Sequence, residues 1–418
     1  MRRLFLCILT MATLGACSDA ESKDEDIHYT QQQKGTVSFQ RSKSEALDIA
    51  VDCLPGSRTR TWTRTDATIE CITSHTATRQ TTTGNDVDTL LYFVNFANSG
   101  GYAIVCGDRR LPSVLAFSDH GTLSSADIAN NPGLSCYFDA FGERYDSLKN
   151  CFLGEKRFTN RQPTRGEIPN SWSDVTRTPI LVTTKWGQFA PYNAYAPTDK
   201  SGHHAVAGCV TVALAQTVAS FNKKIDWDDL HLEANSSKWD DDSIAKLFRK
   251  IGDALHNKWG WYPPNGTSAD MEGIPKVLKK MGFDGLLRDL RFYDDIEREL
   301  IMGRPIIMAA CKIRTKHKIW PISWYTYSRG HCWIADAFLW RKHKELTPSI
   351  MEGSYTIHDY KFFHYNWGWS GKDDGYFLEG IYDTAKKGWI PIWPAPHEQE
   401  NYRWGHQYVS DIIYTRPS

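Results

Sequence analysis

Residues 208–216 read GCVTVALAQ, and this stretch does most to set the architecture of the chain. From Cys209 to about Phe221 the apolar residues recur at helical spacing, and several of them are alanines. A slim apolar helix of this kind can lie at the centre of a core, and the sequence Asn222-Lys223-Lys224 ends the pattern. We therefore expect a buried helix whose first residue is Cys209.

A cysteine at the start of a helix has two common roles. Most single cysteines are small buried apolar residues. At a helix N-terminus, however, the positive end of the helix dipole lowers the pKa of a thiol and favours the thiolate, and the N–H groups there can form half of an oxyanion hole. Cys209 is therefore a candidate nucleophile, and the residues that could activate it have to be sought elsewhere in the chain.

Two later motifs supply such residues. His331 follows Gly330 and precedes an apolar run, so we expect it at a strand end, where it could accept the thiol proton. Asn366 could orient the imidazole through its side-chain oxygen, and Trp367 could shield that hydrogen bond from water. Gln188 could donate a second hydrogen bond to an oxyanion. Alone, each has an ordinary structural explanation, but the order Cys, His, Asn is that of papain-like cysteine peptidases.

The two halves of the chain differ in pattern. A short strand at 37–40 and a helix at 43–50 precede three apolar runs at 90–96, 101–108 and 113–118, which predict an antiparallel meander. Further helices are expected near 242–255 and 269–281. Strands are expected at 306–311, 332–338, 360–365 and 376–378. Helices followed by strands predict an α+β domain in which a cleft separates a helical half from an antiparallel sheet half.

Between these halves lies a polar stretch that contains proline and glycine, at about 159–178. We expect it to be a linker that is open to proteolysis, with Arg161, Arg165 and Arg177 as cleavable positions. The predicted organisation has five parts. These are a signal peptide (1–16), an acidic tether (17–36), an N-terminal α+β domain (37–158), the linker (159–178) and the papain-like domain (179–418).

The N-terminus has the features of an export signal. Two arginines precede an apolar segment that is too short to span a bilayer, and the segment ends in LGAC at 14–17. This ending resembles a bacterial lipobox, so Cys17 is the expected lipidation site and the outer membrane or cell surface the expected location. The acidic stretch that follows is typical of a disordered tether. An ordinary secretory signal, with Cys17 incidental, is the alternative.

Composition excludes several classes of function. The 418 residues include 49 basic and 49 acidic residues, so the chain lacks the basic excess of a nucleic-acid-binding protein. Its ten cysteines contain no C-x-x-C pair, and His203-His204 has no matching ligands nearby. The sequence therefore predicts neither a metal site nor a cofactor.

Taken together, the motifs resemble the streptopain family of papain-like cysteine peptidases. The stretches that carry the resemblance are WGQ (186–188), PYN (191–193), GCV (208–210), GTSA (266–269), GRP (303–305), GH (330–331), YNWGW (365–369) and DGYF (374–377). The first half is similar to the inhibitory propeptide of that family, especially at 92–96 and 101–105. The resemblance covers about residues 37–418.

The resemblance implies an endopeptidase made as a zymogen, with an N-terminal domain that inhibits the catalytic domain in cis. It implies protein or peptide substrates, Cys209 as nucleophile and His331 as base, and it maps the specificity wall onto Ser268 and Gly330. Cys332 stands where the family usually has alanine, which affects the expected substrate preference but not the catalytic assignment. Two alternatives remain open: a binding module that uses an idle cleft, and an amidase or transglutaminase on the same fold.

Overall fold

The structure is a computed structural model, and it describes most of the residues that follow residue 39. It describes residues 40–54, 63–73, 89–109, 111–151, 172–234, 238–261, 266–269, 271–288, 293–319, 322–346, 355–381 and 408–417. The predicted signal peptide, the tether with Cys17, the predicted strand residues 37–39 and residues 159–171 of the linker lie outside these ranges.

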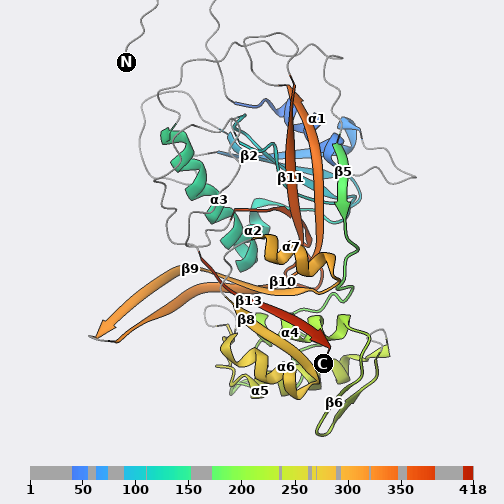
Figure 1. Ribbon diagram of the computed structural model, residues 1–418, viewed down its shortest axis with the longest axis vertical. Coiled ribbons are helices and arrows are strands. Elements are labelled where there is room, and N and C mark those ends of the chain that lie inside the picture. The colour runs from blue at the N-terminus through green and yellow to red at the C-terminus, as the bar shows by residue number, and fades with distance from the viewer. Residues whose placement is uncertain are drawn as a thin grey trace, which may run out of the picture. The chain divides into compact units, whose positions relative to one another are not determined.

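The described elements are numbered in chain order (Figure 1). The helices are α1 (Lys43–Cys53), α2 (Ser125–Asn130), α3 (Pro132–Cys151), α4 (Cys209–Ser220), α5 (Asp241–Ala254), α6 (Ile274–Lys280) and α7 (Tyr293–Ile301), with 3-10 turns η1 (Arg64–Asp66) and η4 (Met271–Gly273). The strands are β1 (Ala67–Thr73), β2 (Thr89–Phe96), β3 (Tyr102–Cys106), β4 (Val114–Ser118), β5 (Trp172–Arg177), β6 (Ile225–Trp227), β7 (Leu230–Leu232), β8 (Phe283–Arg288), β9 (Ile306–Ile319), β10 (Ile322–Leu346), β11 (Tyr355–Asn366), β12 (Gly375–Leu378) and β13 (Tyr408–Pro417).

One antiparallel sheet links the two halves of the chain. Its described strands follow the order β1-β2-β3-β4-β12-β11-β10-β9-β13-β8, and β5 pairs with β10 off this path. Strand β12 is the joint: Tyr376 and Phe377 pair with β4 on one edge and with β11 on the other. The N-terminal meander β1–β4 therefore continues the backbone ladder of the C-terminal sheet.

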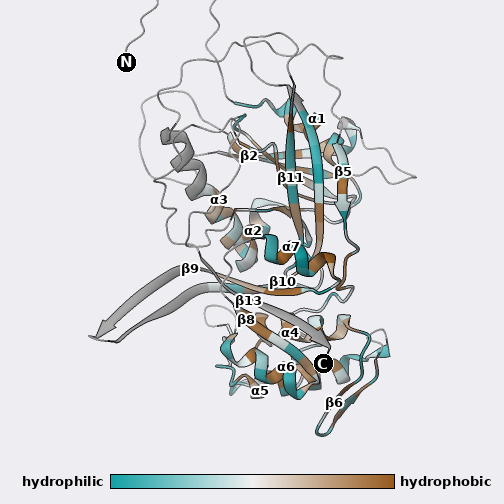
Figure 2. Ribbon diagram, viewed as in Figure 1, coloured by the Kyte–Doolittle hydropathy of each residue, from teal (hydrophilic) through white to brown (hydrophobic). Residues whose placement is uncertain are grey.

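Strand β10 separates two apolar cores, because successive side chains of a strand point to opposite faces. Cys332 and Ile334 join the core formed with α4, α5 and α6, whereas Trp333 and Ala335 join a second core. The second core contains residues of β2, β4 and α3 as well as residues of β10, β11 and β12. In Figure 2, α5 and α7 carry both teal and brown residues, as expected of helices that cover such cores.

Most of the predicted elements are confirmed. The meander appears as β2, β3 and β4, paired antiparallel, and α1 matches the predicted helix at 43–50. Helices α4, α5 and α6 and strands β9–β12 lie where the pattern placed them, although β9, β10 and β11 are longer than predicted. Among the described residues, no helix is both long and apolar enough to span a bilayer.

The predicted linker differs from the structure at its C-terminal end. Residues Trp172–Arg177 form β5, which pairs with β10 from Leu339 to His343. Trp172 stacks on His343 with ring centroids 4.2 Å apart, and the Arg341 guanidinium lies 4.7 Å from the centre of the Trp172 ring. Arg177 is therefore part of the sheet. The polar composition of the stretch gave no sign of this packing, so the sequence predicted a linker there.

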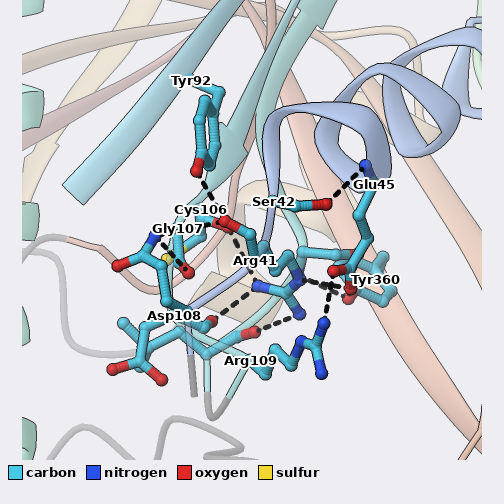
Figure 3. Close-up of polar contacts among 12 residues, drawn as sticks. Arg41, Ser42, Glu45, Tyr92, Cys106, Gly107, Asp108, Arg109 and Tyr360 are labelled. Carbon is cyan, nitrogen blue, oxygen red and sulfur yellow. Dashed lines mark hydrogen bonds and ion pairs between the residues drawn. The ribbon is translucent and has the colours of Figure 1, made fainter. Parts of the chain in front are cut away.

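A buried arginine fastens the start of α1 to the meander (Figure 3). The Arg41 guanidinium donates to the carbonyl oxygens of Cys106 (3.0 Å), Asp108 (2.6 Å) and Leu111 (3.3 Å). The Tyr92 hydroxyl donates to the Arg41 carbonyl at 2.5 Å. Because these groups are buried, each carbonyl would lose a charge-assisted hydrogen bond without regaining one from water if the guanidinium were removed.

We expect Arg41→Met to lower the free energy of unfolding by about 3 kcal/mol, since three buried carbonyls each lose a hydrogen bond from a charged donor. Thermal unfolding followed by circular dichroism measures this, in a Cys209→Ala background that removes the candidate nucleophile. The exposed neighbour Lys43 provides the matched control, and Lys43→Met should leave the midpoint unchanged. Equal midpoints for the two variants would contradict the role given to Arg41.

Candidate active site

Cys209 occupies the first position of α4, directly after Gly208 at the N-cap. Every residue from Val210 to Ala219 is buried, while Cys209 itself is partly exposed. Burial raises the pKa of the Cys209 thiol, and hydrogen bonds from the backbone N–H groups of Cys332 and Val210 offset only part of that rise. The predicted lowering of this pKa is therefore wrong for the arrangement seen here, because desolvation outweighs the helix N-terminus.

His331 lies on β10, one residue before Cys332, and its imidazole is bonded to the backbone. Its Nε2 atom is 2.9 Å from the carbonyl oxygen of Trp367. Since a carbonyl only accepts hydrogen bonds, Nε2 carries the proton and Nδ1 has a free lone pair. Burial lowers the pKa of His331 to about 4, so the imidazole is neutral at pH 7. No hydrogen bond joins Cys209 to His331 in the described part of the chain.

Helix α3 of the N-terminal half lies against this imidazole. A Cβ atom on Gly133 would stand 2.7 Å from His331 Cδ2 and closer still to the Trp367 indole, so only glycine fits there. Asn131, at the start of α3, accepts from the Gly133 N–H at 3.0 Å and donates to the Asp373 carboxylate at 3.2 Å. The N-terminal domain therefore touches the position where His331 and Trp367 meet.

Asn366 ends β11 and does not bond His331 in this arrangement, contrary to the predicted pairing. Its side-chain oxygen accepts from Gln216 Nε2 at 3.0 Å and from the Gly368 N–H at 3.1 Å. Its Nδ2 donates to the Thr184 carbonyl at 3.0 Å. The imidazole instead donates to the backbone carbonyl of Trp367, the residue directly after the expected acceptor Asn366.

Trp367 is fully buried. It does not shield a hydrogen bond between His331 and Asn366, as predicted, because that bond is not formed here. Its ring centroid lies 5.1 Å from that of Trp333, 5.2 Å from that of Tyr365 and 5.1 Å from that of Phe377. Its indole N–H has no partner among the described residues. Trp367 thus anchors the turn that follows β11 in the second core, and its carbonyl holds His331.

The remaining predicted site residues lie on segments that adjoin either Cys209 or His331. The carbonyl of Gln188 accepts from the Ala207 N–H at 2.9 Å, which ties Gln188 to the segment that leads into Cys209. Ser268 is exposed and pairs with Lys258 through the backbone, next to the Thr267 side chain that packs on Gly208. Gly330 is exposed beside His331.

A segment that the residue patterns did not single out connects the two halves at the site. Lys372 pairs with Asp127 at 2.6 Å, and Asp374 accepts from the Trp367 N–H at 2.9 Å. Burial raises the pKa of Asp373 to about 6 and that of Asp374 to about 7. Only Asp374 stood in a motif of the family resemblance, and the role of all three residues follows from contacts with partners distant in the sequence.

A group of carboxylates elsewhere could hold a cation. Oxygen atoms of Asp294, Glu297 and Glu379 lie within 4.8 Å of one another. The Lys361 ammonium already pairs with Glu297 and lies 3.8 Å from Asp294, so a protein cation occupies this cluster. It includes none of the candidate catalytic residues.

Comparison with known proteins gives two family matches. Residues 217–377 match the Peptidase C10 family, and residues 40–145 match the Spi protease inhibitor. His331, Asn366 and Trp367 fall within the first range, and Cys209 and Gln188 precede it.

Individual relatives are distant. The chain is 21% identical over 375 residues to the thiol protease/hemagglutinin PrtT of Porphyromonas gingivalis, a match that covers 74% of this chain and 38% of that protein. It is 20% identical over 352 residues to streptopain of Streptococcus pyogenes, covering 71% and 75% of the two chains. A prointerpain A fragment of Prevotella intermedia aligns with a TM-score of 0.47 at 18% identity, over 80% of this chain and 97% of that one.

The Peptidase C10 match covers the histidine and asparagine motifs, and the Spi match covers the domain whose α3 contacts them. The chain therefore carries a Peptidase C10 region like that of streptopain, with a Spi inhibitor-like region ahead of it.

Proposed function

We propose that this protein is a cysteine endopeptidase in its zymogen form, with Cys209 as nucleophile and His331 as general base. One observation carries the proposal most directly. The backbone of Cys332 lowers the pKa of the Cys209 thiol, and the adjacent residue His331 directs Nε2–H at the Trp367 carbonyl, 2.9 Å away. The imidazole thus already has the tautomer that a base needs, with Nδ1 free to take a proton.

In the proposed active arrangement the imidazole exchanges one acceptor for another. Nε2–H leaves the Trp367 carbonyl for the Asn366 side-chain oxygen, and Nδ1 then takes the thiol proton of Cys209. The thiolate attacks the substrate carbonyl, and the Cys209 N–H and the Gln188 side-chain amide stabilise the oxyanion. The imidazolium protonates the leaving amine, and water, deprotonated by the neutral imidazole, hydrolyses the thioester and frees the thiol.

The prodomain is proposed to prevent this exchange in cis. Gly133 packs on both Trp367 and His331, and the Asn131–Asp373 and Lys372–Asp127 contacts hold the neighbouring segment. As long as α3 stays in place, the imidazole cannot rotate toward Asn366 without a steric clash with this helix. Because β5 is paired with β10, we place the maturation cut before Trp172 rather than at Arg177.

For the substrates we propose proteins or peptides with an apolar side chain next to the cleaved residue, bound near Ser268 and Gly330. For the location we propose export and anchoring in the outer membrane through acylated Cys17. The support is the lipobox-like LGAC at 14–17 and the acidic stretch that follows it.

Cys17→Ser should abolish the anchor, because a serine offers no thiol for acylation. In the producing cell, the wild type should partition into the detergent phase and the variant into the aqueous phase. Partitioning that is the same for both proteins would contradict lipidation at Cys17 and leave the peptidase assignment untouched.

Cys209→Ala should lower casein hydrolysis by roughly 10³-fold or more, because no other group can form the thioester. The variant should also accumulate as one uncleaved species, while the wild type matures to a fragment whose first residue precedes Trp172. Gel electrophoresis with N-terminal sequencing detects this. Cys71→Ala, which removes a free thiol of β1, is the control and should behave as wild type. Casein cleavage by Cys209→Ala at the wild-type rate would refute the mechanism.

Gly133→Ala should weaken inhibition by the prodomain, because even a methyl group collides with Trp367 and His331. We expect an active-site thiol probe to label Cys209 of the uncleaved variant about tenfold faster than that of the uncleaved wild type. Gly142→Ala is the matched control on the same helix, where an added Cβ has nothing within 4 Å. If both variants are labelled at the wild-type rate, α3 does not restrain the imidazole.

A further inference from the structure

Gln216 lies two turns after Cys209 on α4 and is fully buried among apolar neighbours. We propose that Gln216 is a positioning residue that fixes the side-chain amide of Asn366 with its oxygen toward His331. This inference rests on the peptidase function proposed above and adds a residue to its machinery.

The polarity of the Gln216 amide is set by two donors. The Trp186 N–H donates to Gln216 Oε1 at 2.9 Å, and the Thr184 hydroxyl lies 3.1 Å from the same oxygen. A backbone N–H cannot accept a hydrogen bond, so the atom that faces it must be the amide oxygen. The Nε2 group of Gln216 is therefore the group that faces Asn366.

The orientation of the Gln216 amide also fixes the orientation of the Asn366 amide. Gln216 Nε2 is a pure donor, so the Asn366 atom 3.0 Å away from it must be the oxygen. The other end of the Asn366 amide agrees, because Nδ2 donates to the Thr184 carbonyl at 3.0 Å. The segment 184–186, Gln216 and Asn366 thus form a closed ring of hydrogen bonds in which each donor meets an acceptor.

The orientation of this amide matters for the proposed chemistry. His331 Nε2 carries a proton and needs an acceptor when it leaves the Trp367 carbonyl. If Asn366 were flipped, its Nδ2 group would face Nε2–H, and two donors would meet. The imidazole would then lose the hydrogen bond that holds Nδ1 toward the thiol. The Gly368 N–H, which now shares the Asn366 oxygen at 3.1 Å, belongs to the turn that would have to move.

The same ring ties together three parts of the site. Gln216 belongs to the helix that starts at Cys209, Trp186 is two residues before Gln188, and Asn366 ends β11. Burying an amide in an otherwise apolar helix is costly unless its hydrogen bonds are made. Here its oxygen accepts two hydrogen bonds and its Nε2 donates one, so the residue can cross-link these parts without an unsatisfied oxygen.

The test uses the mature enzyme produced by its own processing. Gln216→Met keeps the volume of the side chain but removes the donor to Asn366. Titration with an alkylating probe counts the competent Cys209 sites, and peptide hydrolysis is expressed per titrated site, which removes the effect of misfolded protein. We expect kcat to fall roughly tenfold with KM within about twofold, the loss typical of one orienting hydrogen bond.

Thr217 supplies the matched control. It is the next residue of α4, it is equally buried, and its hydroxyl has no hydrogen-bond partner among the described residues. Thr217→Val should therefore leave kcat within about twofold of wild type. A tenfold loss in this variant as well would assign the effect to general disturbance of α4 and overturn the proposal.

A double-mutant cycle separates positioning from an independent contribution. If Gln216 acts through Asn366, Gln216→Met should cost less than about twofold in an Asn366→Ala background. Losses that multiply would overturn the proposal, as would an unchanged kcat in Gln216→Met alone. A wild-type protein that neither reacts with the probe nor cleaves peptide would instead refute the proposed peptidase function, so the two failures are distinguishable.

Discussion

Strand β12 is paired along both edges, and the arrangement at the active site depends on that pairing. Tyr376 and Phe377 bond β4 of the prodomain and β11 of the catalytic sheet, so the two domains share one ladder. The chain enters β12 through residues that touch both sides: Asp373 accepts from Asn131, and Asp374 accepts from the Trp367 N–H. The position of the prodomain is therefore coupled to the peptide whose carbonyl holds His331.

The difference between the inactive and the proposed active arrangement is small in covalent terms. His331 already lies next to Cys332, whose backbone lowers the pKa of the Cys209 thiol, and its proton is already on Nε2. What separates the states is the acceptor of that proton, Trp367 O or Asn366 Oδ1. Burial favours the neutral imidazole and the neutral thiol, so the closed state avoids placing an ion pair in a dry environment.

The sequence predicted the parts whose signals are local. Helix α4 was predictable because consecutive residues carry both its apolar spacing and its start at Cys209. The meander β2–β4 was predictable because turn residues separate its apolar runs. Strand β5 was not, since its polar residues are held by Trp172 packing on His343 from a distant strand. The bond from the imidazole to the Trp367 carbonyl was not predictable either. It depends on the absence of a side chain at Gly133, which comes 198 residues before His331 in the sequence, and no pattern near the histidine signals it.

Strand β12 carries a further consequence for the protein after its prodomain is lost. Removing β4 uncovers the N–H and C=O groups along one side of β12, and an uncovered strand edge invites pairing with another molecule. One feature opposes such self-association. The strand has only four residues, so the edge that it offers is short. Short edge strands are one means by which natural sheets avoid aggregation, so the strand that seats the prodomain leaves little edge exposed once the prodomain is gone.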